Sequence, residues 1–151
     1  MMNRSKYEEI MQHLIDYLMC LSSTSEIPVA AAIIDENLEI VSKSINLITT
    51  ALDPTAHAEI VAIRQAAKKL ENHRLDSFSL ISTLEPCLMC SGAISQSRIN
   101  KVIFGAYEPK TGFISSLFPT IKEFQPELEV LGGVLEDKCS NILINWFSSK
   151  R

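Results

Sequence analysis

The sequence lacks the usual features of a membrane protein and of a secreted protein. It also lacks the net positive charge of a protein that binds polyanions through its overall charge. No uninterrupted run of about 18 apolar residues occurs, so we expect no transmembrane helix. The N-terminal stretch MMNRSKYEEIMQHLIDYLMCLS lacks the continuous apolar core and small-residue cleavage site of a secretory signal. With 14 Lys and Arg against 18 Asp and Glu, the formal net charge is -4. Any contact with nucleic acid must therefore be local.

Cysteine is also scarce. The chain has four cysteines, two of them in one short motif, which does not suit a disulfide framework. We therefore expect a reduced, cytoplasmic setting, in which the cysteines are thiols or metal ligands. The length of 151 residues and the 46% hydrophobic content suit one compact domain over residues 1–151.

The first third of the chain predicts a helix and a β-hairpin. Apolar residues recur at helical spacing between residues 5 and 21, which is typical of an amphipathic helix. Two β-rich runs then follow, VAAAIID and LEIVSKSI, separated by the turn-prone Asp35-Glu36-Asn37. The first run has no polar alternation, so we expect it to be buried on both faces.

The remainder alternates helices with strands. Asp53 and Pro54 predict the N-cap and first residue of a helix, and Pro86 predicts the start of a short helix that ends near Ser97. Further strands are expected at SFSLIST, KVIFGAY and LEVLGGVL, and a last helix at EDKCSNILINWFSSKR, with Trp146 and Phe147 in the core. This order predicts an α/β fold, a three-layer α/β/α sandwich around a mixed sheet of about five strands.

Candidate chemistry lies at the start of two of the predicted helices, in DPTAHAE and EPCLMC. In each, an acidic residue and a proline precede a side chain that can bind a metal. Cys87 and Cys90 share a helix face, and the positive end of the helix dipole favours their thiolate forms. By themselves these two cysteines fit a redox pair, half of a structural zinc site or part of a catalytic metal centre.

His57 is the best candidate for a third ligand. Cys20 and Cys139 stand alone on apolar helix faces, so a second Cys-x-x-Cys pair for a four-cysteine site is missing. One His and two Cys leave the fourth tetrahedral position open for water, as in catalytic zinc sites. Glu59 is expected beside that water as a proton carrier, because a site over the end of the helix is within reach of both residues.

The spacing His-x-Glu followed by Pro-Cys-x-x-Cys is the known signature of the zinc-dependent nucleoside and nucleobase deaminases. The likeness extends beyond these residues, in close register from about residue 26 to residue 112. The segments that resemble bacterial tRNA-specific adenosine deaminases are EIPVAAAII, DPTAHAEIVAIR, TLEPCLMCSGAI, SRINKVIFGA and KTG.

The resemblance implies hydrolytic deamination of adenosine to inosine at the wobble position of a tRNA anticodon. It further implies a cytidine deaminase-like fold, one zinc ion per subunit, Glu59 as the catalytic residue and a homodimer that binds the anticodon stem-loop.

The resemblance also suggests which residues meet the RNA. Asn46, Ala58 and Pro86 are expected to contact the substrate base, and Lys110, Lys150 and Arg151 to contact phosphates. Leu47 and Ile48 stand where the family commonly has an Arg-Pro pair, which removes one positive charge beside the site.

Two other functions fit parts of the pattern. The net negative charge favours a deaminase of a small molecule such as guanine, cytosine or a nucleotide, because nucleic-acid affinity comes largely from counterion release. A zinc domain that only binds a partner would explain the ligands, but it has no use for Glu59.

Overall fold

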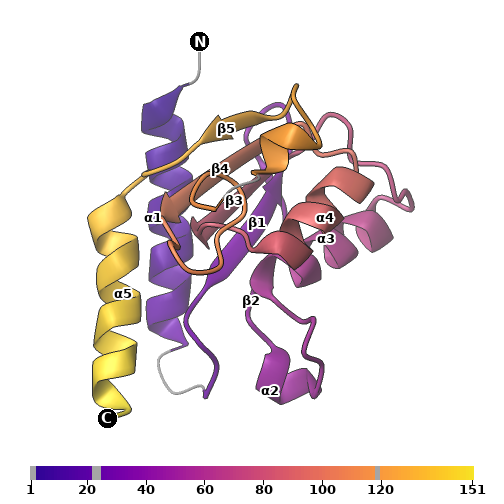
Figure 1. Cartoon of the computed structure of the whole chain (residues 1–151). Helices are drawn as coiled ribbons and strands as arrows, with labels where there is room; N and C mark the ends of the chain where they lie inside the picture. The colour runs from indigo at the N-terminus through magenta and orange to yellow at the C-terminus, as the bar shows by residue number, and fades with distance from the viewer. Residues whose placement is uncertain (1–2, 22–24, 118–119) are drawn as a thin grey trace.

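The computed structural model describes residues 3–21, 25–117 and 120–151. Its centre is a five-stranded sheet in the order β2-β1-β3-β4-β5 (Figure 1). Strand β1 pairs antiparallel with both β2 and β3, whereas β3, β4 and β5 run parallel. The strands are β1 (Ala30–Ile34), β2 (Ile40–Ile45), β3 (Ser79–Leu84), β4 (Lys101–Ala106) and β5 (Glu129–Leu131).

The predicted hairpin forms, and its turn shows why. The Asp35 carboxylate accepts hydrogen bonds from the backbone N–H groups of Asn37 and Glu39, both at 2.9 Å. Aspartate often closes turns in this way, by bonding to the backbone two residues ahead. All five residues of β1 are buried, as the sequence predicts.

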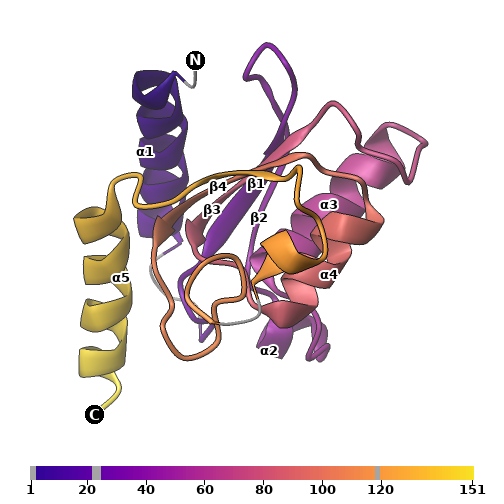
Figure 2. The ribbon, with the colours of Figure 1, turned by 45° about the horizontal axis from the view of Figure 1, so that its top comes forward.

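Helices cover both faces of the sheet. Helices α1 (Arg4–Cys20) and α5 (Glu136–Ser149) lie on one face, and α3 (Ala58–Lys69) and α4 (Leu88–Gln96) lie on the other (Figures 1 and 2). Side chains of β1 alternate between the two cores: Ala31 and Ile33 pack with the α3 side, and Ala32 and Ile34 with the α1 side. The predicted three-layer sandwich around a mixed sheet is therefore confirmed.

Several boundaries differ from the sequence prediction: α4 begins at Leu88 rather than at Pro86, and β5 is shorter than the expected LEVLGGVL. Asp53 does not cap α3, because its carboxylate accepts hydrogen bonds from the N–H and the hydroxyl of Thr55 and so closes a local turn. Helix α3 begins at Ala58, four residues after the expected start. The segment before it forms an unpredicted short helix, α2 (Ile48–Ala51), and a 3-10 turn, η1 (Ile121–Glu123), was also not predicted.

The parallel pair β3 and β4 places the functional residues. Both strands end at the same edge of the sheet, and α4 begins directly after β3. Helix α3 starts at the same edge, after β2 and α2. Crevices at the carboxyl ends of parallel strands are the usual ligand sites of α/β sheets. Within the described ranges, no helix combines the length and the apolar character needed to cross a lipid bilayer.

Candidate active site

Three side chains that can bind a metal converge between the starts of α3 and α4. His57 Nδ1 lies 3.6 Å from Cys87 Sγ and 3.5 Å from Cys90 Sγ, and the two sulfur atoms are 3.7 Å apart. Three such atoms bound tetrahedrally to one zinc ion, at about 2.1 Å for nitrogen and 2.3 Å for sulfur, would lie roughly 3.6 to 3.8 Å from one another. The donor set and its spacing therefore fit zinc.

The backbone explains how residues thirty positions apart meet. His57 and Cys87 are the N-cap residues of α3 and α4, each with an extended conformation (ψ 151° and 179°). An N-cap side chain lies over the end of its helix rather than along its side. Both helix N-termini therefore face the same point, and their partial positive charges favour anionic ligands there.

Hydrogen bonds around Cys87 make it the more acidic thiol. The Cys90 thiol and, after the opposing effect of burial, the His57 ring lower the pKa of Cys87 to about 4. The bond to Cys87 together with burial raises the pKa of Cys90. The same Cys87 thiolate raises the pKa of His57. A thiolate at neutral pH is the form that binds a metal.

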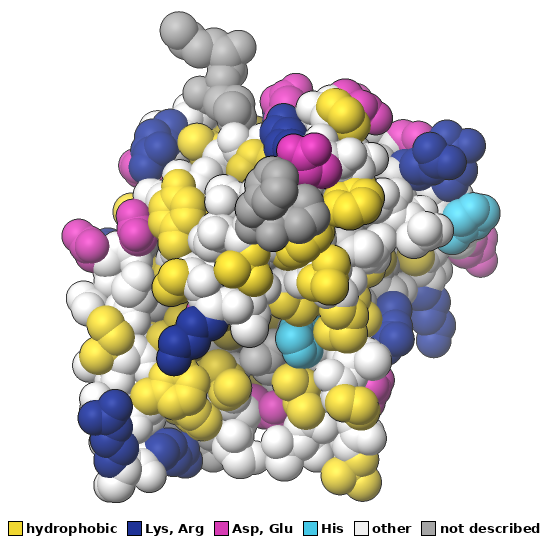
Figure 3. All heavy atoms as spheres, in the orientation of Figure 1, with side chains coloured by type: hydrophobic (Ala, Val, Ile, Leu, Met, Phe, Trp, Pro, Cys, Tyr) yellow, Lys and Arg dark blue, Asp and Glu magenta, His cyan; other side chains and the backbone are white. Residues whose placement is uncertain are grey.

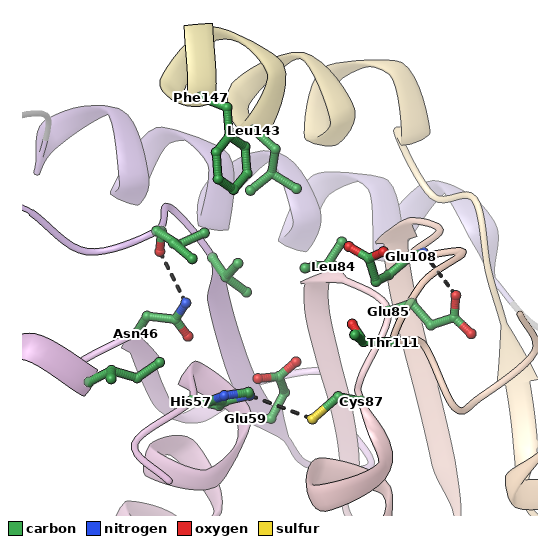
Figure 4. Close-up of a pocket in the computed structure, with 13 residues that line it drawn as sticks. Asn46, His57, Glu59, Leu84, Glu85, Cys87, Glu108, Thr111, Leu143 and Phe147 are labelled. Carbon is green, nitrogen blue, oxygen red and sulfur yellow. Dashed lines mark hydrogen bonds between the residues drawn. The ribbon is translucent and has the colours of Figure 1, made fainter. Parts of the chain in front are cut away.

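Glu59 points into the same pocket from the first turn of α3 (Figure 4). Its side chain is 3% exposed, and the Ser82 hydroxyl donates to it over 3.3 Å. Burial raises the pKa of this carboxyl group. A carboxyl group whose pKa is shifted toward neutrality can both accept and release a proton, which is what general acid and base catalysis needs.

The mouth of the pocket is mainly apolar. Leu143 and Phe147 point from α5 toward the pocket and face His57 and Cys87 across it (Figure 4). Hydrophobic side chains gather in the middle of the face drawn in Figure 3, with basic side chains beside them at the lower left. The lining residues are Ile27, Val29, Asn46, Ile48, His57, Glu59, Leu84, Glu85, Cys87, Glu108, Thr111, Leu143 and Phe147.

Asn46 lines the pocket and also connects two segments of the chain that surround it. Its Oδ1 accepts a hydrogen bond from the N–H of Ala58 at 2.9 Å, and its Nδ2 donates to the carbonyl oxygen of Ile27 at 3.1 Å. The amide thus joins the first N–H of α3 to the segment before β1. An asparagine amide has a second Nδ2 hydrogen, which leaves one donor for a ligand.

The other predicted contact residues are spread more widely. Ala58 and Pro86 are buried, and neither belongs to the described lining of the pocket. Lys110, Lys150 and Arg151 are exposed, and the Lys150 ammonium lies 5.3 Å from the centre of the Trp146 ring.

Sequence reasoning missed several residues of the pocket wall. Phe147 was expected in the core, but it is 48% exposed and lines the mouth. Glu108 and Thr111 flank the predicted Lys110 in the same loop, so the KTG segment was the available signal for them. Ile27 and Leu143 offered no comparable signal, because only the tertiary fold brings them to the pocket.

Comparisons with known proteins agree with this geometry. Residues 4–106 match the family model of the cytidine and deoxycytidylate deaminase zinc-binding region. The tRNA-specific adenosine deaminase of Haemophilus influenzae is 41% identical over 98% of this chain and 87% of its own length. The enzyme of the same name from Bacillus subtilis is 41% identical over 83% of this chain and 79% of its own length.

Solved structures of deaminases are also similar to this chain. One from a study of A-to-I editing by tRNA:A34 deaminases at the wobble position of transfer RNA has a TM-score of 0.78 and 33% identity, and the match covers 88% of this chain and 97% of that one. The guanine deaminase of Bacillus subtilis has a TM-score of 0.60 and 35% identity, over 70% of this chain and 66% of that one.

Proposed function

The chain belongs to the cytidine and deoxycytidylate deaminase family and, within it, to the tRNA-specific adenosine deaminases, and on this premise we propose that it hydrolyses adenosine to inosine at the wobble position of a tRNA anticodon. One observation carries the chemistry: three metal-binding atoms lie 3.5 to 3.7 Å apart, and two of their residues line one pocket with a buried carboxyl group.

His57, Cys87 and Cys90 would hold one zinc ion per subunit. Zinc bound there supplies a Lewis acid that lowers the pKa of water and makes a nucleophile available at neutral pH. Glu59 takes the proton of the attacking water and delivers it to ring N1 of the base, while the oxygen bonds to C6. Glu59 then helps to protonate the departing amino group, so adenosine and water give inosine and ammonia.

The apolar mouth suits a base that has left its stack. Side chains such as Ile48 and Phe147 offer surfaces for the faces of an unstacked purine, and the free donor of Asn46 suits an acceptor on its edge. Such a pocket recognises a nucleotide of a single-stranded loop more readily than one held in a duplex.

The partner would be a tRNA anticodon stem-loop, bound by a cytoplasmic homodimer. Lys110, Lys150 and Arg151 are exposed and can meet phosphates, which position a substrate without reading its sequence. Their local placement matters because the chain as a whole carries a formal charge of -4.

The test is a direct comparison of substrates. Zinc-loaded protein is incubated with an anticodon stem-loop that carries a wobble adenosine and, separately, with adenosine, adenine, guanine and cytosine. We expect inosine in the stem-loop alone, loss of turnover when a chelator removes the zinc, and recovery when zinc returns. Deamination of a free base with the stem-loop left intact would contradict the proposal.

That outcome would favour a small-molecule deaminase, the second candidate. Two observations support this alternative: the negative charge of the chain and its 35% identity to a guanine deaminase. The relatives that match most of the chain at 41% identity carry the tRNA-specific name, which makes the stem-loop the better proposal.

A further inference from the structure

Glu85 is a buried carboxylate that the deamination chemistry does not use. It directly precedes Pro86 and is 2% exposed. Its two oxygen atoms accept hydrogen bonds from the N–H groups of Glu108 (3.0 Å), Ser115 (2.7 Å) and Ser116 (2.9 Å), and from the Ser116 hydroxyl. None of these donors is cationic, so backbone and hydroxyl dipoles compensate the charge here.

All four donors belong to one segment, residues 107–116, which we name the 107–116 loop. This loop contributes Glu108 and Thr111 to the lining of the pocket. In Figure 4 the Glu85 carboxylate turns toward the loop, and a dashed line joins it to Glu108. Hydrogen bonds to an ionised acceptor are stronger than those between neutral groups, so this single side chain is a firm anchor for the loop.

Two backbone contacts tie the same loop to the start of α4. The N–H of Phe113 donates to the Pro86 carbonyl oxygen at 2.9 Å, and Gly112 forms an antiparallel bridge with Cys87. A Cβ atom on Gly112 would lie 2.5 Å from Glu85 Cδ and Oε2. The close approach of loop and carboxylate therefore requires glycine at this position.

We propose that Glu85 is a positioning residue whose carboxylate fixes the 107–116 loop, so that Glu108 and Thr111 form the pocket wall beside His57 and Cys87. The inference rests on the proposed function, because this wall would enclose the substrate base. Its effect is on substrate binding: the loop shapes the mouth, whereas the ligands of the metal are held by α3 and α4.

The variant Glu85→Gln tests this role, because it keeps the size of the side chain but replaces one acceptor oxygen with a donor that opposes an N–H of the loop. We expect KM for the stem-loop to rise by about tenfold or more, since small displacements of positioning groups have effects of this size, while kcat and zinc content change little. Amide hydrogen exchange of residues 108–116 should become faster, while exchange in α3 and α4 stays the same. Glu127→Gln, the same change at an exposed position, is the matched control and should resemble the unmodified protein.

Gly112→Ala gives an independent route to the same loop. Its added Cβ should push the loop away from Glu85 and reproduce both the rise in KM and the faster exchange. If Glu85→Gln fails to fold, Gly112→Ala and Ser116→Ala, which removes the hydroxyl donor, decide the question.

Unchanged KM and unchanged loop exchange in these variants would overturn the role of Glu85 while the proposed function stands. A fall in kcat at constant KM would overturn it in favour of a direct part in proton transfer. Absence of stem-loop deamination in the unmodified protein would instead contradict the proposed function, and the exchange measurements would still test the anchor.

Discussion

At the inner end of the pocket, His57, Cys87 and Cys90 come from the first turns of two helices and lie within 3.7 Å of one another. At its mouth, Ile27 and Phe147 come from segments at opposite ends of the chain. The inner end is polar, and its residues belong to short sequence motifs. The mouth is mainly apolar, and its composition depends on how α5 packs beside the sheet. We therefore expect substitutions at the inner end to remove the chemistry and substitutions at the mouth to change binding.

The largest effect is expected for Glu59→Gln, which tests the inner end directly. The amide cannot carry the proton of the attacking water, so kcat should fall by a factor of at least about 10² to 10⁴, the range that general acid and base groups contribute. Because Glu59 is not a proposed ligand, zinc content measured by mass spectrometry should stay at one ion per chain. A variant that keeps its turnover would exclude Glu59 as the proton carrier and leave the zinc site without a catalytic partner.

Asn46→Ala should affect both ends of the pocket, because its amide joins the start of α3 to Ile27 at the mouth. The substitution leaves the buried N–H of Ala58 without its acceptor, which should lower the free energy of unfolding by about 1 to 3 kcal/mol, whereas the Ile27 carbonyl oxygen still accepts from the N–H of Val29. Urea denaturation measures the loss. Asn72→Ala is the matched control, because the Asn72 amide oxygen accepts from the N–H of the exposed residue Arg74.

If Asn46→Ala is as stable as the Asn72→Ala control, the amide does not hold the helix and its place in the pocket is better explained by contact with substrate. A loss of stability with little change in KM would instead show that the Asn46 amide holds the start of α3 and does not contact the substrate. The two measurements therefore separate a structural role of Asn46 from a role in substrate binding.

The inner end was largely predictable from the sequence, because its chemistry is written in two short motifs. His57, Cys87 and Cys90 could be grouped by residue type and spacing, and the structure brings them together. The start of α3 was predicted wrongly for a physical reason. Asp53 bonds to Thr55 in its own turn, and Asn46, distant in sequence, supplies the partner for the N–H of Ala58.

The mouth was not predictable in the same way. Phe147 lies in a helix whose apolar spacing indicates burial, and only the position of α5 beside the sheet leaves it half exposed over the pocket. Glu85 shows the same limit, because a carboxylate next to Pro86 gives no sign in the sequence that its four donors lie in residues 108–116. Local patterns predicted the elements and the ligands, but not the contacts between distant segments.

Phe147→Ala is expected to have a smaller effect, confined to the mouth. Loss of an aromatic surface that stacks on a base costs about 1 to 3 kcal/mol, so KM for the stem-loop should rise about fivefold or more while kcat is nearly unchanged. Ile144→Ala is the matched control: it lies on the same helix, is 58% exposed and does not line the pocket. Equal KM values for the two variants would show that Phe147 does not contact the RNA and that the mouth is wider than the lining suggests.

The smallest effects are expected for Lys110→Ala and Lys150→Ala, which remove one exposed charge next to Thr111 of the pocket wall and one at the end of α5. Each phosphate contact that is lost should make the dependence of log Kd on log salt shallower by about one unit, with a uniform loss of affinity across loop sequences. Lys68→Ala is the control, because Lys68 lies near the end of α3 that is remote from the pocket, about 15 Å along the helix from Ala58. A stem-loop whose binding weakens equally in all three variants would indicate attraction by general charge. In that case the mouth would contact the base but no phosphate. The two ends of the pocket would then differ in their chemistry and shape, and not in local positive charge that binds the RNA.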